Sequence, residues 1–319
     1  MGYQGIPGLP GCNRENSSGP FAKEGSVLAF IRVPRVLWLV WLLTWGGVSP
    51  AVHADHTKDK TIVTGAGAHF AWIIFDRLRE DLERVSGRRI ELHGRNSALG
   101  MGCNAGIKTA LRNRPGHETF GFTCCPLSDQ ELKKKKLRLF PIALEPIYIL
   151  VNRSNPLQDI SAEQVRAVMR GDIVNWKELG GRDEPIVLVT RLHCKSRPGH
   201  WKTILPDAAE FRQKRLNVKS AADMVQRISD FEGGFGHIGA TWEFGEDSQV
   251  KVLSVDGVRP TAENLRRRKY PFYRELSAVT DQHPSEDVLA IIREVQTGPA
   301  FRRVAKKYNL LPLNKERAP

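Results

Sequence analysis

The stretch Leu137–Asn152, LRLFPIALEPIYILVN, is the longest extended segment expected in this chain of 319 residues. Its apolar residues are nearly continuous, which is typical of a strand covered on both faces, and Glu145-Pro146 interrupts it near the middle. A second extended segment, 235–241, follows after a compact middle unit. This layout predicts two lobes joined by two crossing strands, with a ligand cleft between the lobes.

Strands and helices alternate on both sides of this stretch. Ser128 with Glu131, and Ser161 with Gln164, form capping boxes that predict two helix starts. The alternation predicts an α/β architecture with doubly wound, mixed sheets. Further strands are expected at 61–65, 89–93, 185–190, 250–253 and 275–280, and further helices at 74–86, 198–205, 207–216, 221–229, 284–296 and 299–308.

The first 54 residues have a different character. Arg32 and Arg35 precede the apolar run 36–48, and Val52-His53-Ala54 offers small residues for cleavage. We expect residues 1–54 to be an N-terminal extension with a secretory signal peptide cleaved near Ala54, and 55–319 to be the exported binding domain. An uncleaved membrane anchor is the alternative.

The chain is basic, with 48 Lys and Arg against 35 Asp and Glu and a net charge of +13. Such a charge favours anionic partners. The runs Lys133–Lys136 and Arg266–Arg268 contain no interleaved aromatic residues, so nucleic acid is not expected as a partner. No serine lies in an elbow motif, which argues against a hydrolase.

Four of the five cysteines lie in short segments that follow expected strands. In an α/β sheet such loops meet where ligands bind. In an exported protein these cysteines could form disulfides, remain inert buried thiols, or bind a soft metal ion together with histidines. The candidate metal ligands are His69, Cys103, Cys124, Cys125, His193 and Cys194.

Several motifs resemble the periplasmic phosphate-binding proteins of ABC importers, in the type 2 periplasmic-binding-protein-like family. They are PIALEPIYILVNRSNP at 141–156, NWKELGG at 175–181, GGFGHIGATW at 233–242 and DGVRPTAENLRRRKYPFY at 256–273. The resemblance covers nearly all of 61–313. It implies a Venus-flytrap receptor with one lobe of about 58–145 plus 240–319 and a second of about 146–239.

The resemblance also implies the function. Such a protein is no enzyme and needs no cofactor; as a monomer in the periplasm, it binds phosphate or a related oxyanion such as arsenate and delivers it to an ABC permease of the inner membrane. Where the family has a hydroxyl residue, a serine and an aspartate, this chain has His69, Cys103 and Cys124, while Arg191 is kept. The candidate ligand-binding residues are His69, Phe70, Cys103, Asn104, Cys124, Arg191, Cys194, Lys195, Ser196 and Arg197.

A thiol is a weak hydrogen-bond donor and a poor replacement for serine or aspartate in an oxyanion site. The altered positions therefore leave two alternatives open. One is a protein that binds a soft metal ion or metalloid through the cysteine and histidine loops. The other is a redox or sensory module on the same fold.

Overall fold

The computed structural model describes residues 61–70, 72–93, 102–125, 127–194, 197 and 199–313. The expected N-terminal extension and its cleavage site lie outside the described residues. Among the helices that the structure describes, none is both long enough and apolar enough to cross a membrane.

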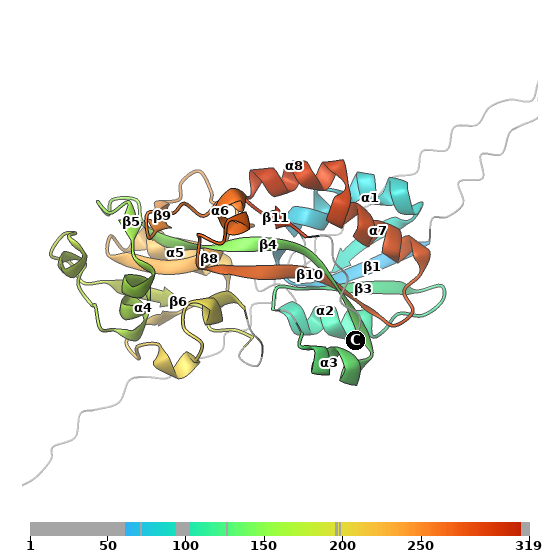
Figure 1. Ribbon diagram of the computed structural model, residues 1–319, viewed down its shortest axis with the longest axis horizontal. Helices are drawn as coiled ribbons and strands as arrows, with labels where there is room; N and C mark the ends of the chain where they lie inside the picture. The colour runs from blue at the N-terminus through green and yellow to red at the C-terminus, as the bar shows by residue number, and fades with distance from the viewer. Residues whose placement is uncertain are drawn as a thin grey trace, which may run out of the picture. The chain divides into compact units, whose positions relative to one another are not determined.

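One long strand, β4 (Leu137–Asn152), has the bounds that the sequence predicts. Its first part pairs antiparallel with β10 (Tyr273–Asp281), and its last part pairs with β8 (Gly234–Gly239) and β9 (Val250–Val255). Because its first part pairs with a strand of one half and its last part with strands of the other, β4 runs from one half of the molecule into the other (Figure 1). The sheet order is β2-β1-β3-β10-β4-β8-β6-β7, so the sheet is mixed as predicted.

The first half packs helices on three parallel strands. Its core stacks Phe75, Phe120 and Phe122, with ring centroids 4.4–5.5 Å apart. Gly106 and Gly121 let a helix lie directly on a strand, since a Cβ on Gly121 would stand 2.0 Å from the Gly106 carbonyl oxygen. The elements are β1 (Ile62–Gly67), a π-helical turn (Trp72–Asp76), α1 (Arg79–Ser86), β2 (Arg89–His93), α2 (Gly102–Ala110), β3 (Glu118–Thr123), α3 (Asp129–Lys135), α7 (Glu286–Thr297) and α8 (Pro299–Lys307).

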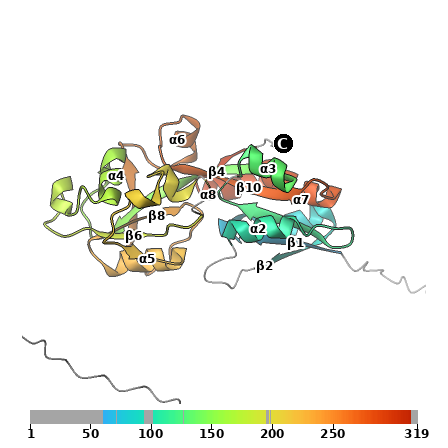
Figure 2. The ribbon, with the colours of Figure 1, turned by 90° about the horizontal axis from the view of Figure 1, so that it is seen from below.

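The second half has a core of its own. Trp176 is fully buried, packs on Phe235 and donates from its indole nitrogen to the Gly233 carbonyl oxygen at 3.1 Å. The elements are β5 (Asp159–Ile160), α4 (Ala162–Arg170), β6 (Val187–Thr190), β7 (Leu216–Asn217), α5 (Ala221–Asp230), α6 (Ala262–Arg266), β11 (Leu311–Pro312) and 3-10 helices at Trp176–Leu179, His200–Thr203 and Ala208–Glu210. Figure 2 shows α4, α5 and β6 in one half and α2, α3 and α7 in the other.

The structure differs from the sequence prediction in the division between the lobes and in the helices expected over 198–205 and 207–216; in the first of these segments the described residues form only a 3-10 helix, His200–Thr203. Leu253, Tyr270 and Phe272 belong to the core of the second half, although the predicted division at residue 240 assigns them to the first lobe. The chain therefore returns to the first half through β10, and not through 235–241. The prediction of one helix over 207–216 is wrong, because Phe211 turns into the second core and Arg212 donates its backbone N–H to the Met169 carbonyl oxygen.

Candidate functional site

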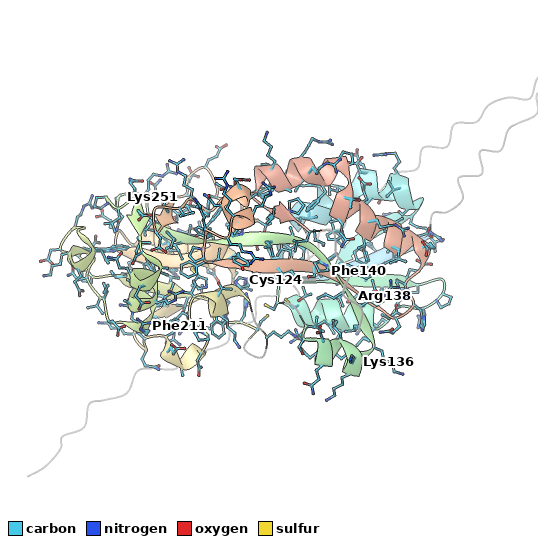
Figure 3. All side chains as sticks on the ribbon, in the orientation of Figure 1. Cys124, Lys136, Arg138, Phe140, Phe211 and Lys251 are labelled. Carbon is cyan, nitrogen blue, oxygen red and sulfur yellow. The ribbon has the colours of Figure 1, made fainter. Side chains whose placement is uncertain are left out.

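A cavity of about 130 Å³ lies where the loops of both halves meet. That volume is room for several water molecules or a small ion. Figure 3 shows Cys124, one of its lining residues, between Phe140 of the first half and Phe211 of the second. The titratable residues that line the cavity are His69, Cys103, Cys124, Arg191, His193, Cys194, His200, His237 and Arg274.

Strand ends and helix starts position these side chains. His69 follows β1, Cys124 follows β3 and Arg191 follows β6, so three loops deliver residues to one place. The first turns of α2 and α5 also line the cavity, through Cys103 and Ala221. Unpaired backbone N–H groups at a helix start, together with the helix dipole, favour a negative charge there. Two helix starts therefore add positive potential to the cavity.

A buried ion pair forms one wall. The Arg274 guanidinium donates from Nε to the Glu145 carboxylate, which is fully buried, and Thr241 donates its backbone N–H to Glu145 Oε1 at 2.7 Å. Burial opposes the charge of Arg274, but the Glu145 carboxylate outweighs it and raises the pKa of Arg274. Gly239 makes room for the pair, since a Cβ there would stand 2.4 Å from Arg274 Nη2.

One nitrogen of the Arg274 guanidinium has no hydrogen-bond partner. This atom, Nη1, is buried, and the residue as a whole is only 7% exposed. A buried cationic donor without an acceptor is unfavourable by itself. Arg191 stands at the same cavity, where its Nε donates to the Lys219 carbonyl oxygen at 2.9 Å. The cavity thus brings together a guanidinium group from the loop after β6 and one from the connecting strand β10.

The cavity histidines are uncharged near neutral pH. Burial, reinforced by the charges of Arg274 and Arg191, lowers the pKa of His69 to about 4. Burial also lowers the pKa of His193 to about 4 and that of His237 to about 3. The Nδ1 atoms of His193, His200 and His237 are buried without partners. As neutral rings, the histidines each offer one N–H donor.

The four cysteines of the described segments are free and close together. The Sγ atoms of Cys103 and Cys124 are 3.5 Å apart, and the Cys124 backbone N–H donates to Cys103 Sγ at 3.2 Å. The Sγ atoms of Cys103, Cys125 and Cys194 all lie within 4.8 Å of one another. The arrangement brings a group of thiols to the edge of the cavity.

The structure brings together part of the residue set proposed from sequence. His69, Cys103, Cys124, Arg191, His193 and Cys194 line the cavity, and Cys125 lies buried behind its wall. Phe70 packs in the first core and Asn104 is exposed on α2, so neither lines the cavity.

Arg197, also proposed as a ligand residue, is directed elsewhere: it pairs with Glu131 at 3.5 Å. Lys195 and Ser196 are outside the described residues. Sequence reasoning missed Arg274, His200 and His237 as site residues. Of these, His237 stands inside the GGFGHIGATW motif and His200 inside the helix expected over 198–205, whereas Arg274 carries no local signal.

These features define a class: a two-lobed α/β protein with a small, positively charged cavity between its lobes. Residues 56–299 match the family model described as "PBP superfamily domain", and the chain belongs to this superfamily.

Named relatives are consistent with this membership. A phosphate-binding protein PstS of Bacillus subtilis is 30% identical over 132 residues, which are 41% of this chain and 43% of that protein. A PstS of Borreliella burgdorferi is 25% identical over 49% of this chain and 60% of that protein. The chain thus matches less than two thirds of the length of these curated relatives.

Solved structures share the fold. A putative phosphate ABC transporter substrate-binding protein with bound phosphate from Clostridium perfringens has a TM-score of 0.67 at 24% identity, covering 79% of this chain and 100% of its own. An ABC-type phosphate transport receptor from Vibrio cholerae has a TM-score of 0.59 at 21% identity over the same shares.

Proposed function

We propose that this chain is an exported solute-binding protein of the phosphate ABC transporter type, which binds phosphate or a related small oxyanion in the cavity. The observation that carries the proposal is the buried, unpartnered Nη1 of Arg274, which lies at the same cavity as Arg191. An oxyanion would accept charge-assisted hydrogen bonds from both guanidinium groups, and such bonds contribute about 1.5–3 kcal/mol each.

The surroundings support an anion over a cation at this position. The helix starts of α2 and α5 line the cavity, and a helix start favours phosphate and similar anions. Neutral histidines can donate without adding charge. The carboxylate nearest Arg274, that of Glu145, is already engaged by Arg274 and Thr241, so it does not compete for the cavity.

The relatives support a binding role and not catalysis, since their names describe phosphate-binding and transport proteins. On this proposal the chain acts outside the cytoplasm and delivers its ligand to a membrane permease. The signal peptide expected before residue 55 would direct its export. Closure of the two lobes around the anion would be the signal that the permease recognises.

The test is titration calorimetry of the full chain with inorganic phosphate, comparing Arg191→Gln with Arg166→Gln. Arg166 is a matched control: it is also half-buried and also donates from Nε to a backbone carbonyl, that of Ile204 at 3.2 Å, but it does not line the cavity. We expect Arg191→Gln to weaken phosphate binding at least about tenfold and Arg166→Gln to leave it unchanged. Equal affinity of Arg191→Gln and the unmodified chain would refute the proposal.

A further inference from the structure

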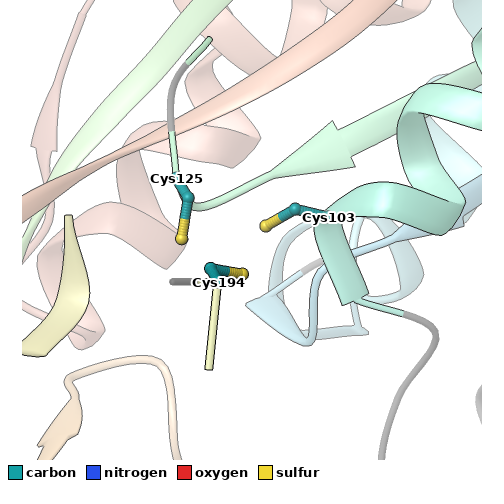
Figure 4. Close-up of side chains that lie close together, drawn as sticks. All are labelled: Cys103, Cys125 and Cys194. Atoms are coloured by element: carbon teal, nitrogen blue, oxygen red, sulfur yellow. The ribbon is translucent and has the colours of Figure 1, made fainter. Parts of the chain in front are cut away.

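We propose that Cys103, Cys125 and Cys194 form a site for a soft, thiophilic metal cation, and that the bound cation fastens the two halves of the molecule together. Their three Sγ atoms lie within 4.8 Å of one another (Figure 4). Thiolates are the ligands that Zn²⁺ and Cu⁺ prefer. This inference does not depend on the proposed oxyanion, which binds through arginines.

The three Sγ atoms are close enough together to bind one metal ion. Zn–S bonds of about 2.3 Å in a tetrahedral site place the sulfurs about 3.8 Å apart, so the three Sγ atoms need to approach by about 1 Å at most. A disulfide needs about 2.05 Å. The Sγ pair of Cys103 and Cys124, at 3.5 Å, would have to close by about 1.5 Å.

The backbone holds Cys194 toward the other two thiols. Its φ of 52° lies in the left-handed region, which residues other than glycine adopt at an energetic cost. The Arg197 backbone N–H donates to the Cys194 carbonyl oxygen at 3.1 Å and closes the turn.

The three ligands come from both halves. Cys103 stands in the first turn of α2 and Cys125 follows β3, and both belong to the first core. Cys194 follows β6 of the second half, yet it packs against the first core. A cation bound by all three would therefore tie the loop after β6 to the first half.

The charge of such a complex is also balanced. A divalent cation with three thiolates carries a net charge of −1. Arg191 and Arg274 line the same cavity as Cys194, and their positive charges offset this negative charge. Cys103 and Cys194 line the cavity, so a further coordination position is accessible from it to water or a small ligand.

The test titrates the full chain with Zn²⁺ after reduction by a phosphine, in buffer without phosphate, and measures stoichiometry by equilibrium dialysis and unfolding by a thermal scan. We expect one Zn²⁺ per chain and a rise in Tm. Cys125→Ser and Cys194→Ser should each weaken Zn²⁺ binding at least about tenfold and abolish the rise. Cd²⁺ should give an ultraviolet thiolate-to-metal charge-transfer band that both variants lack.

Cys124→Ser is the matched control, because the Cys124 thiol lies 3.5 Å from that of Cys103 but is not one of the three. It should keep Zn²⁺ binding within about threefold of the unmodified chain. The proposal is overturned if the reduced chain binds no stoichiometric Zn²⁺, or if Cys194→Ser binds it as tightly as the unmodified chain. If Cys103 and Cys124 form a disulfide instead, oxidation will remove two free thiols and Cys124→Ser will prevent this loss. That result, together with no Zn²⁺ bound after reduction, would also overturn the proposal. Since phosphate is absent, either failure leaves the oxyanion proposal standing.

Discussion

The ion pair of Glu145 and Arg274 gives the sharpest test of how the cavity is built. The Glu145 side chain is 0% exposed and that of Arg274 is 6% exposed. Removing one partner of such a pair leaves the other charge buried and uncompensated, which typically destabilises a protein by about 3–5 kcal/mol. We expect Arg274→Met to lower the free energy of unfolding by about this amount, measured by urea denaturation.

The double variant Glu145→Gln/Arg274→Met separates charge from packing. The amide oxygen introduced at position 145 can still accept the two hydrogen bonds that Thr241 donates, and no buried charge remains. Replacing a buried ion pair with neutral groups of similar volume is often close to neutral for stability. We therefore expect the double variant to unfold within about 2 kcal/mol of the unmodified chain and to be clearly more stable than Arg274→Met.

The same double variant then reports on binding. It folds but lacks the Nη1 donor that Arg274 offers to the cavity, so phosphate affinity should fall at least about tenfold in calorimetry. Two results would refute the reasoning. If the double variant is as unstable as Arg274→Met, the loss is not electrostatic; if it binds phosphate with unchanged affinity, Arg274 is not part of the anion site.

Two further predictions concern protonation and packing. Burial lowers the pKa of His237 to about 3, whereas an unfolded histidine titrates near 6.5, so unfolding takes up a proton between these pH values and stability falls as the pH drops from about 6.5. Between pH 6 and 5, the free energy of unfolding of His237→Gln should therefore fall by about 1.4 kcal/mol per pH unit less than that of the unmodified chain. Equal slopes for the two chains in urea titrations would contradict this. Gly121→Ala places a Cβ against the Gly106 carbonyl oxygen and should destabilise by about 1–3 kcal/mol, whereas Gly245→Ala, with no atom within 4 Å of the new Cβ, should unfold at the same urea concentration as the unmodified chain.

Local patterns in the sequence predicted those elements whose bounds depend on interactions between residues that are close in the sequence. The continuous apolar run of β4 gave its bounds, and both capping boxes form as predicted, with Ser128 accepting from Glu131 and Ser161 from Gln164. The segment 207–216 shows the limit. Its pattern fits a helix, but burial of Phe211 against Trp201 in the second core outweighs the local preference.

The site could be predicted only in its sequence-local part. The loops after β1, β3 and β6 were identifiable, because residues following parallel strands meet at one edge. Arg274 was not, because it lies within a strand whose sequence resembles an ordinary half-buried one. Its role depends on Glu145, 129 residues away, and on the gap that Gly239 leaves. Such a pairing is decided by tertiary packing, which a single sequence does not reveal.

The loop after β6 connects the two proposals physically. Arg191 and Cys194 belong to this loop, and Arg197 extends it to Glu131 of α3 in the first half. An oxyanion that contacts both Arg191 and Arg274 would link this loop to the connecting strand β10, and a cation held by Cys194 and Cys103 would link it to the first half. A ligand shifts a conformational equilibrium only by its differential affinity for the two states, so either ligand would favour the arrangement in which the halves are close. Exchanging hydroxyl for thiol ligands can thus change what the cavity binds while the closure that follows from binding stays the same.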